Sequence, residues 1–184
     1  MKRILKSFCA ALIALLPVVA VAQIDGEFVK PRNGKFLLKN ATVVTVTKGT
    51  LTNTSVLLDN GKIIQVGTTI SSDGAEVIDC TGMFIYPGII DGGTRLGLVE
   101  VSSVPETVDY SDVGNVTPNM QALTTVNPNS EAIGVTRVSG VTTVLTVPTG
   151  GLFPGTAALI NLNGYTPDQM YGGFKAVAMT FPSS

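Results

Sequence analysis

The chain of 184 residues contains no histidine. It therefore offers no imidazole, the side chain that serves most often as metal ligand and as general acid or base in enzyme sites. Cysteine is nearly as scarce, because only Cys9 and Cys80 are present. Cys9 lies in an N-terminal segment with the features of a signal peptide, so Cys80 remains alone afterwards and no internal disulfide can form. Without a histidine to activate it, we expect Cys80 to be a buried, inert thiol in a strand.

Positive charge is also in short supply once the first 22 residues are set aside. The whole chain has 12 basic and 13 acidic residues. Three of the basic residues lie in the first 22 positions, which leaves 9 basic and 13 acidic residues and a net charge of −4. There is no basic stripe and no aromatic cluster, so the composition argues against nucleic-acid binding.

The N-terminus has the three parts of a signal peptide. Lys2, Arg3 and Lys6 are positively charged, residues 8–21 are apolar, and Ala20-Val21-Ala22 is a small-x-small cleavage site. We expect residues 1–22 to be cleaved after Ala22 and the protein to be exported to the periplasm or the extracellular space, without membrane contact afterwards. A single N-terminal anchor helix is the alternative, although the apolar run is short for a membrane span.

Residues 36–86 have the pattern of short strands. Turn residues are frequent, the apolar and β-branched runs are short, and no helical period is present. Asn60-Gly61 separates two apolar runs, and such a pair is the strongest short-range hairpin signal because both turn residues need positive φ. We expect residues 23–86 to form a small antiparallel β-sandwich. The expected strands are 36–46, 55–59, 62–67, 75–79 and 83–86.

The pattern changes after Pro87. A short strand at residues 89–91 is followed by a helix within residues 127–140, which starts near Asn127-Pro128-Asn129-Ser130 and stops at Gly140. The β-branched run 141–147 predicts a further strand, and this order is how a β/α barrel begins. Only 98 residues follow Tyr86, whereas a complete barrel needs about 200 or more. We therefore expect residues 87–184 to be the start of an incomplete (β/α)8 barrel.

Such an incomplete barrel has a physical consequence. Residues 156–162 and 174–181 also have the pattern of extended segments. In half a barrel, residues 141–147 or 174–181 would be left with unpaired edges and apolar faces. We therefore expect a partner that covers them, because exposed strand edges and apolar patches promote aggregation.

Four short motifs occur in a characteristic order between Leu37 and Arg95. They are Lys39-Asn40, Asn60-Gly61-Lys62-Ile63-Ile64-Gln65-Val66-Gly67, Val77-Ile78-Asp79-Cys80-Thr81-Gly82 and Pro87-Gly88-Ile89-Ile90-Asp91. In this order they resemble the N-terminal region of amidohydrolase-superfamily proteins, especially the imidazolonepropionase-like and dihydroorotase-like branches. Residues 140–144 also resemble the family's second barrel strand. Further resemblance to secreted members of the first branch lies in Pro118, residues 127–130 and Gly150-Gly151.

The resemblance implies both a fold and a chemistry. The family fold is a small composite β-sandwich, built from both chain ends, beside a (β/α)8 TIM-like barrel. One or two divalent metals, often zinc, activate water to hydrolyse a non-peptide C–N bond in an amide or ring. The family's metal ligands are two histidines after the first barrel strand, a lysine or glutamate midway, two further histidines and a late aspartate.

Little of that ligand set carries over to this chain. The family pattern Pro-Gly-x-Ile-Asp-x-His-x-His aligns with residues 87–95, where Gly93 and Arg95 stand at the two histidine positions. Glycine has no side chain and arginine stays protonated, so neither binds a metal. Asp91 matches the aspartate before the ligand pair, which is usually structural in the family. We predict no catalytic residue, no metal ligand and no cofactor in this chain.

Two other features each admit two interpretations. Four acids lie in one segment without a compensating base: Glu100, Glu106, Asp109 and Asp112. They form either a calcium site or a solvated acidic loop, and their spacing, unlike that of an EF-hand, favours the loop. The glycines of residues 149–156 resemble a phosphate cradle. They lack the lysine of a P-loop, so a turn after a strand is favoured.

Arg95 is the one candidate for substrate binding. Loops at the carboxyl ends of barrel strands carry function, so Arg95 could hold an anionic substrate there or form an ion pair with a nearby acid. The sequence thus predicts an exported amidohydrolase-family protein of which this chain is an inactive N-terminal portion. A missing C-terminal portion or a homo-oligomer would complete it and bind a small-molecule substrate. The alternative is a non-catalytic secreted β-rich binding or scaffold module that has lost the metal site.

Overall fold

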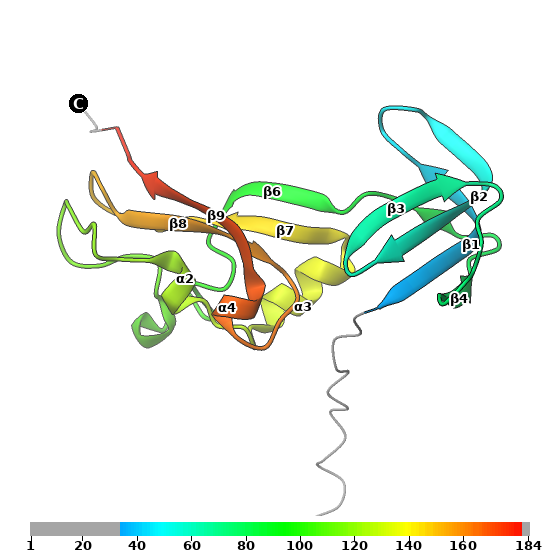
Figure 1. Cartoon of the computed structure of the whole chain (residues 1–184). Coiled ribbons are helices and arrows are strands. Elements are labelled where there is room, and N and C mark those ends of the chain that lie inside the picture. Colours follow the sequence, from blue (N-terminus) through cyan, green and yellow to red (C-terminus); the bar gives the residue numbers. More distant parts are fainter. Residues whose placement is uncertain (1–33, 182–184) are drawn as a thin grey trace, which may run out of the picture. The chain divides into compact units, whose positions relative to one another are not determined.

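The computed structural model describes residues 34–181, which form two mixed β-sheets and a few short helices (Figure 1). The strand-rich fold expected from the sequence is confirmed. The expected signal peptide, residues 1–22, lies outside the described residues. Within residues 34–181, no helix is long and apolar enough to cross a membrane.

The first sheet has the strand order β3-β2-β1-β4, with β5 also paired to β1. Its strands are β1 (Lys35–Val44), β2 (Thr50–Asp59), β3 (Lys62–Gly67), β4 (Glu76–Asp79) and β5 (Phe84–Ile85). The pairs β1–β2 and β2–β3 are antiparallel, whereas β4 and β5 run parallel to β1. The purely antiparallel arrangement expected from the sequence is therefore wrong for β4 and β5. After β3 the chain crosses to the far side of β1 instead of turning back in another hairpin.

The hairpin predicted at Asn60-Gly61 is confirmed. These two residues connect β2 to β3 with φ values of 47° and 77°, and Asp59 pairs with Lys62 across the turn. Asparagine and glycine are the residues that tolerate left-handed φ at lowest cost. The turn chemistry therefore sets the register of the residue pairs next to the turn, and the register shifts between Leu57 and Leu58.

Asp79 at the end of β4 joins two of the sequence motifs. Its Oδ1 accepts hydrogen bonds from the Thr81 hydroxyl (2.7 Å), from the Thr81 backbone N–H (3.1 Å) and from the Asn40 side-chain amide (3.2 Å). Asn40 lies within β1 with a φ of 61°. The asparagine of the first motif and the aspartate of the third are thus hydrogen-bonded partners that hold the end of β4 against β1.

The pKa of Asp79 is lowered from its ordinary value of 3.8, first by the Thr81 hydroxyl and then by the Asn40 amide. Its ionised form therefore stabilises the folded state above pH 3.8, and this contribution is lost as the pH falls through the lowered folded-state pKa. Compared with the wild type, Asp79→Asn should be less stable at neutral pH, and the difference should narrow below pH 3.8. Urea unfolding at pH 7 and pH 3 measures this, and a difference that does not change with pH would contradict it.

The core of the first sheet is small. Its buried members are Ala41, Val43, Val56 and Cys80. Cys80 is 6% exposed, and its Sγ lies 3.8 Å from the Ile78 carbonyl oxygen. The prediction of a buried thiol is confirmed.

The second sheet has the order β6-β7-β8-β9. Its strands are β6 (Ile89–Thr94), β7 (Val141–Thr146), β8 (Gly155–Asn161) and β9 (Tyr171–Ala178). β6 and β7 are parallel, and the pairs β7–β8 and β8–β9 are antiparallel. The helical segments are the 3-10 turn η2 (Pro105–Thr107), α2 (Ala122–Thr125) and α3 (Glu131–Val138) between β6 and β7, and α4 (Pro167–Met170) between β8 and β9.

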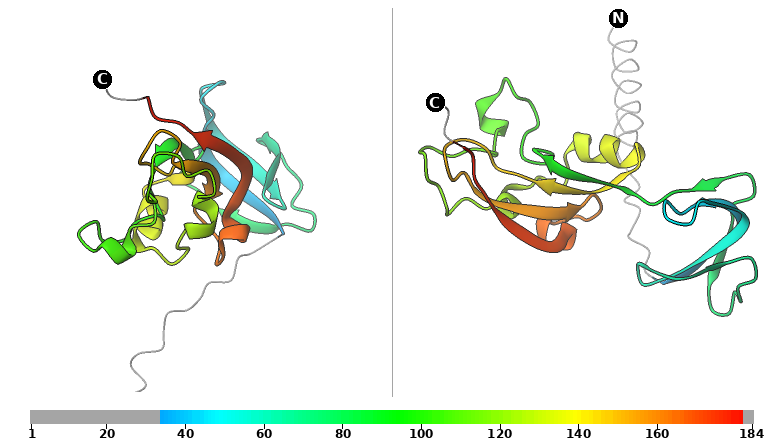
Figure 2. Two further views of the ribbon diagram at one scale, coloured as in Figure 1. Left: turned by 90° about the vertical axis from the view of Figure 1, so that its left-hand side faces the viewer. Right: turned by 90° about the horizontal axis from the view of Figure 1, so that it is seen from above.

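Several local expectations for this half are confirmed. α3 begins directly after Ser130, and Gly140, with a φ of 93°, follows its end. The run 141–147 contains β7, which lies between β6 and β8, so of the two segments considered for an unpaired edge this one is paired on both sides. A glycine-containing turn after β7 folds β8 back onto it. β9, by contrast, is an edge strand, and Figure 2 shows it curving along the outer side of β8.

One core joins the second sheet to its helices. Val144 of β7 and Ile160 of β8 are fully buried, and they pack in the same cluster as Leu123 of α2, Ile133 of α3 and Met170 of α4. The three helices therefore cover the same face of the sheet, as Figure 1 shows. Leu96, which follows β6 next to the candidate site, packs against this core.

Gly134 offers a test of the helix assignment. It lies inside α3, and a Cβ added there would meet no atom within 4 Å. Gly134→Ala should stabilise the chain by about 0.5–1 kcal/mol, because glycine is a poor helix former. Gly140→Ala is the matched control: it also has open space but a φ of +93°, so it should destabilise. Urea unfolding compares them, and effects of the same sign would contradict the assigned end of α3.

Candidate functional site

The candidate site lies where β6 and β7 end side by side. The Val147 N–H donates to the Thr94 carbonyl (2.8 Å), and the Thr146 hydroxyl donates to the Leu96 carbonyl (3.0 Å). Thr146 is fully buried, so its hydroxyl is well shielded from water. Arg95 lies between the two accepting carbonyls. Its backbone is therefore fixed by the end of the neighbouring strand.

Asp91 serves the local backbone of β6. Its Oδ1 accepts a hydrogen bond from the Gly93 N–H at 3.0 Å. This is a short-range turn contact in which the carboxylate satisfies a backbone donor. The observation fits the structural role that the family resemblance implies for Asp91.

Gly93 leaves open space at the position of the first family histidine. A Cβ added to Gly93 would meet no atom within 4 Å, and the same holds for Gly92. The φ angle of Gly93 is not positive, so its backbone conformation is open to residues other than glycine. The fold therefore has room for a side chain at this position, and the sequence does not supply one.

Arg95, at the position of the second family histidine, is exposed and contacts an aromatic ring. Its guanidinium carbon lies 4.3 Å from the centroid of the Tyr110 ring, within the range of a cation–π interaction. Within residues 34–181, no carboxylate is within salt-bridge distance of Arg95. The ion pair considered from the sequence is therefore not the contact that these residues make.

Tyr110 was not predicted to belong to the site. Its carbonyl accepts a hydrogen bond from the Thr149 N–H at 2.7 Å, which ties the segment before α2 to the turn after β7. The end of β6, Tyr110 and this turn thus converge at one edge of the sheet. Nothing in the local sequence signals the contact, because Tyr110 lies 15 positions from Arg95 in a segment without regular structure.

The glycines after β7 form a tight turn packed on another segment. Gly151 has a φ of +70°, and a Cβ there would lie 2.7 Å from the Asn115 carbonyl oxygen. That same oxygen accepts hydrogen bonds from the Leu152 and Phe153 N–H groups at 2.7 and 3.0 Å. The glycines therefore permit close backbone packing, as expected for a turn after a strand.

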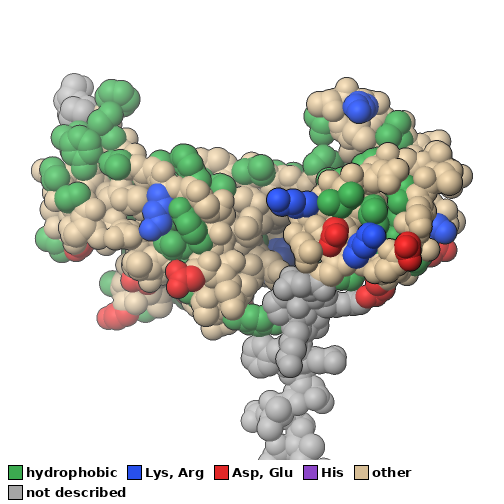
Figure 3. All heavy atoms as spheres, in the orientation of Figure 1, with side chains coloured by type: hydrophobic (Ala, Val, Ile, Leu, Met, Phe, Trp, Pro, Cys, Tyr) green, Lys and Arg blue, Asp and Glu red, His purple; other side chains and the backbone are tan. Residues whose placement is uncertain are grey.

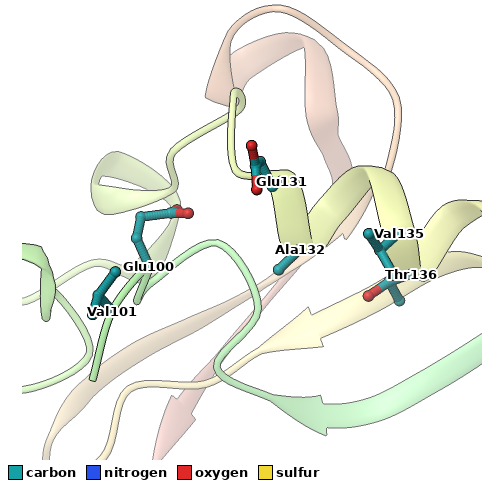
Figure 4. Close-up of a pocket in the computed structure, with 6 residues that line it drawn as sticks. All are labelled: Glu100, Val101, Glu131, Ala132, Val135 and Thr136. Atoms are coloured by element: carbon teal, nitrogen blue, oxygen red, sulfur yellow. The ribbon is translucent and has the colours of Figure 1, made fainter. Parts of the chain in front are cut away.

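The four acids of residues 100–112 are exposed and have separate environments. Glu100 accepts hydrogen bonds from the Asn127 amide (3.0 Å) and the Ser130 hydroxyl (2.9 Å). Figure 4 shows Glu100 extending toward the start of α3, across a hollow of about 470 Å³. The hollow is lined by Glu100, Val101, Glu131, Ala132, Val135 and Thr136. Among the described residues, no group of three or more acidic or cysteine side chains is placed to hold a metal ion.

The donors at the end of β6 do not fit a divalent metal. Gly93 contributes no atom, Arg95 is a cation stacked on Tyr110, and one oxygen of Asp91 is engaged by a backbone N–H. Zinc sites need three or four nitrogen, sulfur or oxygen donors around one point. The chemistry open to the site itself is recognition by a positive charge.

Comparisons with known proteins agree with the motifs and the fold. The chain is 36% identical over 90 residues to a D-hydantoinase of Geobacillus stearothermophilus, covering 49% of this chain and 18% of that protein. It is 31% identical over 103 residues to a dihydroorotase of Pelotomaculum thermopropionicum, covering 45% and 24%. A crystal structure of an amidohydrolase from Thermotoga maritima matches with a TM-score of 0.73 and 31% identity, covering 80% of this chain and 39% of that chain. No protein-family profile matches.

These similarities identify the chain by family. The solved structure carries the fold comparison, because its match extends over most of the chain, and the two sequence relatives agree with it. The chain belongs to the amidohydrolase superfamily. It spans less than half the length of each of these three proteins.

Proposed function

We propose that this chain is the N-terminal portion of an exported amidohydrolase that hydrolyses a non-peptide C–N bond in a small molecule. The similarity to the Thermotoga maritima amidohydrolase over 80% of the chain carries this proposal. The names of the two sequence relatives, D-hydantoinase and dihydroorotase, point to cyclic amides as the substrate class. The signal-like residues 1–22 support export.

In this proposal the described sheets are parts of two incomplete domains. Residues 23–86 contribute the first strands of a composite β-sandwich, and residues 87–184 begin the barrel with the parallel unit β6–α3–β7. The edge strand β9 and the residues just after it leave four apolar side chains exposed: Phe174, Val177, Met179 and Phe181. Figure 3 shows apolar side chains gathered at the end of the sheet that carries β9. A C-terminal portion, or a second copy of the chain, covers them.

The chain by itself is catalytically inert. The residues at the family's first two ligand positions are Gly93 and Arg95, and neither can hold a metal. Neither residue would contribute a donor to a metal of a completed protein. Arg95 remains as a substrate-binding residue at the carboxyl ends of β6 and β7.

A non-catalytic secreted module is the second candidate function. The observation that favours it is the open space at Gly93 together with the aromatic contact of Arg95. A site that keeps the fold but fills its ligand positions in this way is suited to binding rather than hydrolysis. The activity of the protein encoded by the complete gene distinguishes the two candidate functions.

The deciding experiment begins with the gene beyond the codon for Ser184. A continuing reading frame with two histidines and a late aspartate favours the enzyme, and the encoded protein should then hydrolyse hydantoin or dihydroorotate when zinc or manganese is supplied. The 184-residue chain, exported in a bacterial host, should show no turnover and should begin at Gln23. Turnover by the 184-residue chain alone would contradict its inertness. A completed protein that hydrolyses no cyclic amide would favour the binding module.

A further inference from the structure

The strongest unexplained feature of the chain is an exposed arginine without an acidic partner. The segments from β6 to β9 contain many more acids than bases, so an ion pair is the ordinary expectation for Arg95. Instead, its guanidinium lies on the Tyr110 ring, 4.3 Å from the centroid, and within residues 34–181 no carboxylate pairs with it. Two acids of the following segment make other contacts: Glu100 with Asn127 and Ser130, and Asp112 with the Val113 N–H.

The backbone segments that carry this guanidinium and its aromatic partner are anchored. The backbone on both sides of Arg95 is tied to the end of β7 through the Thr94 and Leu96 carbonyls. The Arg95 carbonyl also accepts a hydrogen bond from the Leu98 N–H at 2.9 Å. On the other side, Tyr110 is anchored to the turn after β7 through Thr149. A binding group that is already held in place loses less entropy when a ligand arrives.

Open space lies over Gly93, two residues before Arg95. An added Cβ atom at Gly93 would meet nothing within 4 Å. A small ligand over Gly93 would therefore contact the backbone of β6 rather than a side chain at that position. Arginine presents a planar fork of N–H donors that matches the two oxygens of a carboxylate.

We infer that Arg95 and Tyr110 form a subsite for the carboxylate of a small ligand at the end of β6. The guanidinium binds the two carboxylate oxygens, and the Tyr110 ring holds the guanidinium in its plane. Arg95 touches the ligand, whereas Tyr110 acts through Arg95 and is a positioning residue. The fixed positive charge stands where the family pattern has its second metal-binding histidine.

This inference deepens the proposed function by naming a substrate class, and its location rests on that function. Binding of a carboxylate by Arg95 is nevertheless measured without any turnover. If the chain binds a carboxylate saturably but the completed protein hydrolyses nothing, the carboxylate subsite is supported and the proposed enzymatic function is refuted. If the completed protein hydrolyses its substrate but the chain binds no carboxylate, the enzymatic function is supported and the carboxylate subsite is refuted.

The test is an NMR titration of the exported chain, labelled with ¹⁵N, at an ionic strength of about 10 mM to limit screening. The probe is succinate, and its neutral counterpart succinamide is the matched control. The Arg95 Nε–Hε resonance is assigned by its loss in Arg95→Gln. Succinate should shift this resonance in a saturable manner, and succinamide should leave it in place. Equal shifts with both compounds, or no saturable shift, would overturn the subsite.

Amino-acid substitutions distinguish the contribution of the forked guanidinium geometry of Arg95 from that of its positive charge. Arg95→Lys keeps the charge and should lower the association constant about tenfold, because lysine lacks the fork. Tyr110→Leu should lower it about threefold, since the guanidinium is less well oriented. Lys175→Gln removes one charge from another cation–π pair, 5.6 Å from the Tyr171 centroid, and should change nothing. Unchanged binding in Arg95→Lys, together with weaker binding in Lys175→Gln, would reduce the effect to net charge and refute the subsite.

Discussion

Replacing Gly155 with alanine should destabilise the chain by about 3 kcal/mol or more, from the combined cost of left-handed φ and overpacking. Gly155 begins β8 with a φ of +128°, and an added Cβ would lie 2.5 Å from the Met120 carbonyl oxygen. The obstacle is backbone, because this carbonyl also accepts the Thr156 N–H at 2.9 Å. Relief would require the segment before α2 to move away from β8. Urea unfolding of the exported chain measures the loss.

Gly173→Ala is the matched control for this substitution. Gly173 also has positive φ, +82°, but an added Cβ would meet no atom within 4 Å. Alanine there should cost only about 1 kcal/mol, the ordinary penalty of left-handed φ. Equal losses at Gly155 and Gly173 would show that the close approach of Met120 to β8 has no energetic weight, and the packing described for the second sheet would then be wrong.

Restoring both family histidines should give the chain a metal-binding site. Gly93→His combined with Arg95→His places two imidazoles two residues apart, on the same side of an extended segment. Open space at Gly93 accommodates the first, and loss of the guanidinium removes the positive charge. The double variant should bind zinc at least about tenfold more tightly than the parent, because imidazole is a strong zinc ligand. Calorimetric titration with zinc measures the difference.

The control for the double variant moves one imidazole by a single residue. Gly92 has the same open surroundings as Gly93, but neighbouring strand positions point to opposite faces. Gly92→His with Arg95→His should therefore gain much less affinity than the pair at 93 and 95. If both double variants bind zinc equally, the alignment of residues 93 and 95 with the family's histidine pair has no geometric meaning.

The parts of the fold that follow from the sequence are those set by neighbouring residues. Asn60-Gly61 forces a hairpin because both residues accept left-handed φ, and Gly140 ends α3 for the same reason. The parallel pairing of β4 and β5 with β1 was not predictable in this way. It depends on where the chain goes after β3, and contacts between distant strands leave no local pattern.

For the candidate site, too, the features set by a local motif were predicted from the sequence, and the contact between distant segments was not. Gly93 and Arg95 were identified by their place in a motif, and the structure puts them at the end of β6, beside β7. The contact of Arg95 with Tyr110 was missed, because the acidic segment that contains Tyr110 has no periodic pattern that would place it. The sequence led us to expect an anion or an acid beside Arg95, and the described residues supply an aromatic ring instead.

The most direct test of the central claim is the metal content of the purified, exported chain, determined by elemental analysis of the folded fraction from gel filtration. The claim is that a positively charged recognition residue, Arg95, stands directly after β6 of this superfamily member in place of a metal ligand. Less than stoichiometric zinc, manganese and iron is the predicted result. One metal ion per folded chain, retained through gel filtration, would contradict it and would direct attention to Asp91 and the acids of residues 100–112 as ligands.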